Sequence, residues 1–276
     1  MSGFSLRHAI GLTSLLACTA ATANPLVVRQ QTDWKAVDGC AREISVAEFG
    51  KPLVVGCAAG GPGGFQIFRR NGSQWDLQPG AGVKIADLGN ALTPFIIDKN
   101  GGLWRGSGAR QPGCVQEIAS STRPDLWAVN CDRASGGYVI QRADNLTPVV
   151  AGGKPGDYDV STWQTLPSKN GALKVAVGDT VWMINRDRQI YTFDRTSSQW
   201  QMKPGCAVEI AANGPHAWVI GCAAGGDGGN QIFQWSASGW KIVKGAAMKV
   251  AVDNLGNPWV IDKSGGIWTW TFKTPR

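Results

Sequence analysis

The stretch VVGCAAGGPGGFQIF, residues 54–68, returns almost unchanged as VIGCAAGGDGGNQIF, residues 219–233. Each copy joins a β-branched run to a cysteine and then to a cluster of glycines. Two copies of so unusual a phrase, 165 residues apart, indicate that the chain is built from internal repeats. The period of those repeats therefore decides the fold.

A tryptophan followed after four residues by a glycine marks a shorter repeat. It occurs as WKAVDG (34–39), WDLQPG (75–80), WQMKPG (200–205) and WKIVKG (240–245). A fifth match at Trp163 contains an insertion, and a sixth has Gly108 where the tryptophan is expected. Three short β-branched or aromatic runs, bounded by Gly, Pro, Asn or Asp, follow each match, and such runs are typical of strands.

Six units of about four strands and roughly 40 residues predict an all-β fold, a six-bladed β-propeller with four-stranded blades. The N-terminal segment DWKAV offers one extra strand, and the last unit, which ends in IWTWTF, lacks one. We expect the first strand to complete the last blade, which would close the ring and place Trp34 beside Trp268 and Trp270. Closure of this kind hides the sheet edges that an open array would expose.

The repeated phrase is expected to cover the end of the second strand and the following loop in blades one and five. Blades two and six share another phrase, IIDKNGGLW (96–104) and VIDKSGGIW (260–268). The underlying unit is therefore predicted to be a pair of blades, repeated three times.

The first 23 residues are predicted to be a signal peptide. Arg7 and His8 precede an apolar run, and Ala21 and Ala23 fit the small-residue rule for cleavage. Residues 24–276 would then form a single secreted domain without a transmembrane anchor, because the apolar run is too short to span a bilayer. The alternative is lipid attachment at Cys18, as in a bacterial lipoprotein.

The six cysteines that remain after Cys18 fall into three close pairs. We expect the disulfides Cys40–Cys57, Cys114–Cys131 and Cys206–Cys222, because an even number of cysteines in an exported chain indicates disulfides. In each pair the cysteines flank an antiparallel hairpin, whose open end brings them within the Cα separation of about 4.4–6.8 Å that a disulfide needs. Each bond is expected to contribute about 3 kcal/mol by loop entropy.

Charge and motifs limit the function. Loss of Arg7 would lower the net charge from +7 to +6, which favours anionic partners such as acidic glycans or lipopolysaccharide; the alternative is that this charge serves only solubility. No basic run with interleaved aromatic residues points to nucleic acid. No catalytic, cofactor or metal motif is present, and the sialidase-like phrase IDKNGGLW has the wrong spacing, so we expect neither an enzyme nor a cofactor.

The phrases WKIVKGAAMKVAV, PWVID and GGIWTW resemble the tectonin β-propeller repeat, and the resemblance covers residues 33–276. Two features depart from that pattern, namely the missing tryptophan at Gly108 and an insertion at 143–162. The resemblance implies a lectin that binds microbial glycans, lipopolysaccharide, or N-acetylated and methylated sugars. Several similar blades would offer several weak copies of one site, which raises avidity.

Tryptophans that recur at one repeat position are expected to pack between blades: Trp34, Trp75, Trp200 and Trp240 in the fourth strand, and Trp127, Trp182, Trp218 and Trp259 in the second. Trp235 and Trp270 instead align with Arg70 and Gly106. They are candidates for exposed platforms on which a sugar stacks, although Trp270 alternatively covers the closure seam.

Polar candidates for the same ligand lie in the DKNGG and DKSGG turns. These are Asp98, Lys99, Asp262 and Lys263, for which the alternative is a solvated hairpin turn. Two rival functions stay open, a protein-interaction scaffold and a glycan-cleaving enzyme with paired carboxylates in the central pore.

Overall fold

The computed structural model describes residues 34–48, 50–88, 93–120, 125–148, 158–166 and 171–270. The expected signal peptide and Cys18 lie outside these residues. Within them the chain forms strands and turns without any helix, which confirms the all-β prediction. None of this part forms a helix long and apolar enough to cross a membrane.

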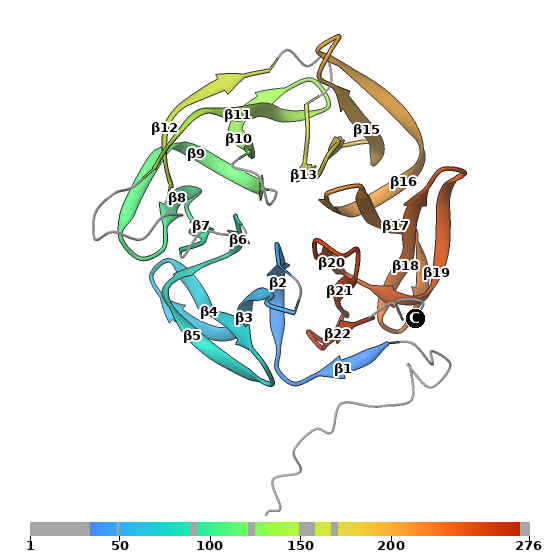
Figure 1. The fold of residues 1–276 in the computed structure, drawn as a ribbon, viewed down its shortest axis with the longest axis horizontal. Helices are drawn as coiled ribbons and strands as arrows, with labels where there is room; N and C mark the ends of the chain where they lie inside the picture. The colour runs from blue at the N-terminus through green and yellow to red at the C-terminus, as the bar shows by residue number, and fades with distance from the viewer. Residues whose placement is uncertain are drawn as a thin grey trace, which may run out of the picture.

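The strands form four antiparallel sheets arranged around a common centre (Figure 1). Two sheets have four strands each. One has the order β1 (Lys35–Val37), β22 (Ile267–Thr269), β21 (Pro258–Ile261), β20 (Lys249–Val252), and the other runs β2 (Ala41–Ser45), β3 (Leu53–Gly61), β4 (Gly64–Asn71), β5 (Gln74–Gly82).

The other two sheets have seven strands each. One contains β6 (Lys84–Ala86), β7 (Phe95–Ile97), β8 (Gly102–Arg105), β9 (Ala109–Ser120), β10 (Leu126–Ala134), β11 (Gly137–Pro148) and β12 (Tyr158–Thr165). The other contains β13 (Lys174–Val177), β14 (Val181–Ile184), β15 (Gln189–Asp194), β16 (Gln199–Asn213), β17 (His216–Gly226), β18 (Gly229–Ser236) and β19 (Gly239–Ala247).

Each seven-stranded sheet contains one long strand that changes partners along its length. In β9, Cys114 pairs with Gly102 of β8, and the next residue, Val115, pairs with Asn130 of β10. In β16 the same change follows Cys206. Separate strands were expected here, and instead the backbone stays extended through a bend at a glycine with positive φ, Gly113 in β9 and Gly205 in β16. Four sheets of four and seven strands therefore replace six separate ones.

The N-terminal strand joins the last sheet, as predicted. Strand β1 pairs with β22, with Lys35 opposite Thr269 and Ala36 opposite Trp268. The rings of Trp34 and Trp270 lie 5.7 Å apart, and the Trp34 Nε1 donates to the carbonyl of Lys244 at 2.7 Å. The two ends of the described chain are thus held together side by side (Figure 1).

The glycine-rich phrase forms a long hairpin rather than the expected loop. Strands β3 and β4 are separated only by Pro62 and Gly63, and β17 and β18 are separated in the same way. A Cβ on Gly64 would lie 2.5 Å from the carbonyl oxygen of Gly82, and one on Gly229 would lie 2.6 Å from that of Ala247. Both residues also have positive φ, so the hairpin tip can approach the outer strand only where side chains are absent.

The three predicted disulfides are confirmed, with Cα separations of 5.6, 5.5 and 5.5 Å for Cys40–Cys57, Cys114–Cys131 and Cys206–Cys222. The apolar core lies in clusters between neighbouring strand groups. The second-strand tryptophans are buried there, as expected: Trp127, Trp182, Trp218 and Trp259 are at most 5% exposed.

Candidate functional site

Six charged side chains form a closed ring at the centre of the molecule. They come from the six innermost strand segments and alternate in sign: Glu43, Lys84, Glu117, Lys174, Glu209 and Lys249. Every neighbouring pair is a salt bridge, with N–O distances of 2.7–3.0 Å. We call this set the axial charge ring. Its side chains are only 11–22% exposed, so these charges are held largely away from water.

Four members of the ring have pKa values shifted in the direction that favours their charged forms. Burial by itself would raise the pKa of Glu43, but the attraction of Lys84, Lys249 and Lys174 outweighs it, and the pKa falls far below the ordinary value. The pKa of Glu117 is lowered by the same balance. Burial opposes the charge of Lys84 and Lys249, yet the surrounding glutamates raise the pKa of both lysines well above their usual range.

A small cavity of about 80 Å³ lies along the axis beside the ring. Its walls include Glu43, Glu117 and Glu209, with small and branched residues such as Ile44, Ala86 and Val177 around them. Pockets that enclose a small-molecule ligand have volumes of about 300–1,000 Å³. The cavity therefore has room for a few water molecules and is too small for a sugar ring with its contacts.

The glutamates of the axial charge ring can be compared with the paired carboxylates that a glycan-cleaving enzyme would need. Buried carboxylates in the pore are what that reaction would need, but a general acid must hold a proton near neutral pH, which requires a raised pKa. The pKa of Glu43 and of Glu117 moves in the opposite direction. Glu43 and Glu117 are thus suited to joining strands through salt bridges and poorly suited to donating a proton.

The aspartates of the two glycine-rich turns hold those turns together. Asp98 accepts hydrogen bonds from the backbone of Asn100 and Gly102 and from the Trp104 Nε1, at 2.8–2.9 Å. Asp262 accepts the matching bonds from Ser264, Gly266 and the Trp268 Nε1. The pKa of Asp98 is lowered: desolvation, which raises it, is outweighed by the bonds from Trp104, Gly102 and Asn100.

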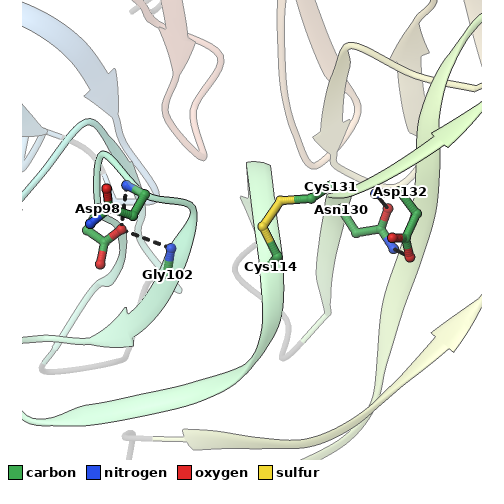
Figure 2. Close-up of a disulfide and its surroundings, with 7 residues drawn as sticks. Asp98, Gly102, Cys114, Asn130, Cys131 and Asp132 are labelled. Carbon is green, nitrogen blue, oxygen red and sulfur yellow. Dashed lines mark hydrogen bonds between the residues drawn. A yellow bond between two sulfur atoms is a disulfide. The ribbon is translucent and has the colours of Figure 1, made fainter.

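The second glycine of each turn must lack a side chain, because a Cβ on Gly102 would lie 2.6 Å from the Asp98 Oδ2. Figure 2 shows the Asp98–Gly102 bond beside the Cys114–Cys131 disulfide. The first glycine, Gly101, is close enough to that disulfide for a Cβ to meet the Cys114 Sγ at 2.9 Å. Gly265 has the same relation to Cys40.

Lys99 and Lys263 project from these turns as exposed side chains. Their backbone N–H groups donate to the carbonyls of Gly63 and Gly228, in the tips of the glycine-rich hairpins. Arg186 makes the third equivalent bond, to Gly136. One face of the molecule thus repeats the same arrangement three times, and the structure places Lys99 and Lys263 on it about a common axis rather than together in one site.

Trp235 and Trp270 lie at interfaces where one group of strands packs against the next. We call these interfaces seams. Trp235 contacts Trp182 and Trp240, with ring centroids 5.3 and 4.9 Å apart, and Trp270 contacts Trp34. Phe193 occupies the same place against Trp127 and Trp200. These residues therefore share one structural position with Arg70, and both tryptophans are half-buried.

Apolar side chains are exposed on the outer strands at a recurring position. Leu77, Met202 and Ile242 are 60%, 63% and 64% exposed, and each follows a half-buried outer-strand tryptophan by two residues. Residues two apart in a strand point to the same side. The rim of the molecule thus presents three similar apolar surfaces, formed by Trp75 with Leu77, Trp200 with Met202 and Trp240 with Ile242.

Sequence reasoning missed both the axial charge ring and these rim surfaces. Each had a readable signal in the aligned repeats. The ring residues begin six equivalent triplets, EIS, KIA, EIA, KVA, EIA and KVA, and the rim residues follow the repeat tryptophan as WDL, WQM and WKI.

No known sequence family and no curated protein matches the chain. Several solved structures are similar in fold. A structure of the mitotic checkpoint complex matches with a TM-score of 0.53 at 11% identity, over 95% of this chain and all of that one. A streptogramin B lyase matches with a TM-score of 0.50 at 14% identity, over 88% of each chain.

The WD40 β-propeller domain of Doa1 matches with a TM-score of 0.50 at 11% identity, over 87% of this chain and 95% of that domain. Identities this low show only that the folds are similar, because one fold carries many unrelated functions. The likenesses support a β-propeller and leave the tectonin resemblance a prediction.

Proposed function

We propose that the protein is an exported, non-catalytic lectin that binds microbial surface glycans through several similar sites on its rim. Its architecture would be a six-bladed propeller in which β9 and β16 each serve two blades and β1 completes the last one. Three disulfides are consistent with an oxidising compartment outside the cytosol, as export requires.

The observation that carries this proposal is the threefold recurrence of a half-buried indole beside an exposed apolar side chain. Sugars present apolar C–H faces that stack on aromatic rings, and their hydroxyl groups need polar partners at the edge. The axial cavity is too small for a sugar, so a ligand would have to bind at the surface. Three weak surface sites on one rigid body would bind a repetitive glycan with high avidity.

The test is retention of the protein on immobilised lipopolysaccharide or glycan, with elution by free sugar. Replacing Leu77, Met202 and Ile242 by serine, one at a time and together, should reduce retention progressively. Leu255→Ser is the matched control, because Leu255 is 59% exposed but is not in an outer strand. A glycan array that stays silent at high protein concentration, or equal retention of the triple variant, would contradict the proposal.

A protein-interaction scaffold is the second candidate. It is favoured by β5 and β19, which end their sheets and carry the exposed Leu77 and Ile242. Such an edge can accept a further strand from a partner. Capture of a protein partner that survives deglycosylation, together with silent glycan arrays, would favour this function over the lectin.

A further inference from the structure

One seam carries an arginine at the position where three other seams carry an aromatic ring, Phe193, Trp235 or Trp270. It lies between the sheet that contains β21 and the sheet that contains β4 and β5. Arg70 pairs with Trp75 across β4 and β5, just as Trp235 pairs with Trp240 across β18 and β19. The Arg70 guanidinium lies over the Trp75 ring at 5.3 Å from its centroid.

The Arg70 side chain has no acceptor among the described residues. It is half-buried, and its Nη1 is sealed from solvent without a hydrogen-bond partner there. Within the described ranges, each of the other half-buried arginines has an acceptor: Arg69 donates to Asp87, Arg105 to Asp159 and Arg142 to Asp125. A partly desolvated charge without a partner is costly, so the group calls for an acceptor from outside.

A second unpaired donor belongs to the same seam. Trp259 is 5% exposed, and its Nε1 has no partner within the described part of the chain. Trp259 belongs to the buried cluster against which Trp75 packs. Trp259 occupies the position in β21 that Trp182 occupies in β14. In the equivalent seam further round the molecule, Trp182 is the residue that Trp235 contacts.

We propose that this seam binds the carboxylate of an acidic saccharide, with Arg70 as its anchor and the neighbouring indoles of Trp75 and Trp259 as reporters of binding. A guanidinium recognises a carboxylate through two parallel hydrogen bonds. The partly exposed Trp75 and the exposed Leu77 supply apolar surface for the sugar ring. The inference rests on the proposed lectin function and gives one of its rim sites a chemical class.

The experiment is a titration of ¹⁵N-labelled protein with methyl glucuronide, methyl glucoside and sodium acetate, followed by the indole N–H resonances and by calorimetry. We expect the glucuronide to bind at least tenfold tighter than the glucoside and to shift the N–H signals of Trp259 and Trp75. Arg70→Trp, which copies the equivalent positions Trp235 and Trp270 and so should fold, is expected to lose at least tenfold in glucuronide affinity. Arg133→Gln, which removes an exposed arginine elsewhere, should bind as the unaltered protein does.

Four outcomes would overturn the proposal. Acetate that binds as tightly as the glucuronide would show a carboxylate site without sugar recognition. Equal binding of glucuronide and glucoside, or full affinity in Arg70→Trp, would remove Arg70 as the anchor while leaving the lectin function standing. If none of the three compounds shifts the indole N–H signals of Trp259 and Trp75, no ligand binds beside these residues, and water is the partner of the unpaired donors. Glucuronide binding with silent glycan arrays would instead contradict the lectin function and leave this site in place.

Discussion

Removal of one lysine from the axial charge ring should destabilise the protein severely. Lys84 makes two salt bridges, at 2.7 Å to Glu43 and 3.0 Å to Glu117. Each corresponds to an attraction of about 6 kcal/mol at an effective dielectric constant of about 20. Desolvation of the charges offsets most of that gain, so for Lys84→Met we expect a net loss of about 3–5 kcal/mol, the range measured when one partner of a buried pair is removed.

The assay is urea and thermal unfolding of the disulfide-intact protein. A loss of that size corresponds to a fall in Tm of about 6–20 °C for a chain of this length. Lys51→Met is the matched control, because the Lys51 side chain is 61% exposed and its bridge to Glu48 lies at the surface. Its removal should change stability by less than about 1 kcal/mol.

A double variant separates charge balance from packing. Lys84→Met with Glu117→Met removes adjacent members and leaves Lys174, Glu209, Lys249 and Glu43 as a balanced, fully paired chain. Its loss should be smaller than the sum of the two single losses, because no excess charge stays buried. A Lys84→Met loss below about 1 kcal/mol, or strictly additive losses, would refute the view that the ring acts as a unit.

The ring also predicts a pH dependence. Glu43 and Glu117 have lowered pKa values, so their contribution is present above the unfolded pKa and is lost as the pH falls through the folded one. Lys84 and Lys249 have raised pKa values, so theirs is present below the unfolded pKa and is lost as the pH rises through the folded one. The stability difference between the unaltered protein and the double variant should be flat between about pH 5 and 10. A stability difference that peaks only below or only above pH 7 would contradict this prediction.

Further predictions concern the turns, the disulfides and the seams. Gly102→Ala should lower the free energy of unfolding by about 2 kcal/mol, because the added Cβ would collide with the Asp98 carboxylate. Gly72→Ala, with open space around its Cβ, should lower it by about 1 kcal/mol. Equal melting temperatures of the two variants would contradict the steric argument. Replacing Cys40 and Cys57 together by serine should cost about 3 kcal/mol in chemical denaturation, and an unchanged midpoint would count against a role in stability. Trp235→Ala should cost about 3 kcal/mol, while Trp235→Phe, which copies Phe193, should restore most of it. Glycan retention that falls in Trp235→Phe at full stability would show that Trp235 contacts the ligand as well.

Several features of the fold could be predicted because they depend on spacing along the chain. The Trp-x₄-Gly pattern gave the strand groups, and the surplus strand at one end and the missing one at the other gave the pairing of β1 with β22. The cysteine pairs followed from the open end of an antiparallel hairpin. In each case the partners are neighbours within one sheet, and strand geometry alone brings them together.

The site was less predictable, because its residues meet only through closure of the chain around an axis. Nothing in the separate triplets around Glu43 and Lys84 says that six such residues form one ring, since that depends on the curvature of the assembled sheets. The tertiary structure likewise placed Trp235 and Trp270 in seams and directed the carboxylates of Asp98 and Asp262 into their own turns. The sequence by itself determined which strands exist and which neighbours pair. Packing between sheets decided which charges converge on the axis and which indoles remain partly exposed at the rim. Those contacts join residues that share no local spacing in the sequence.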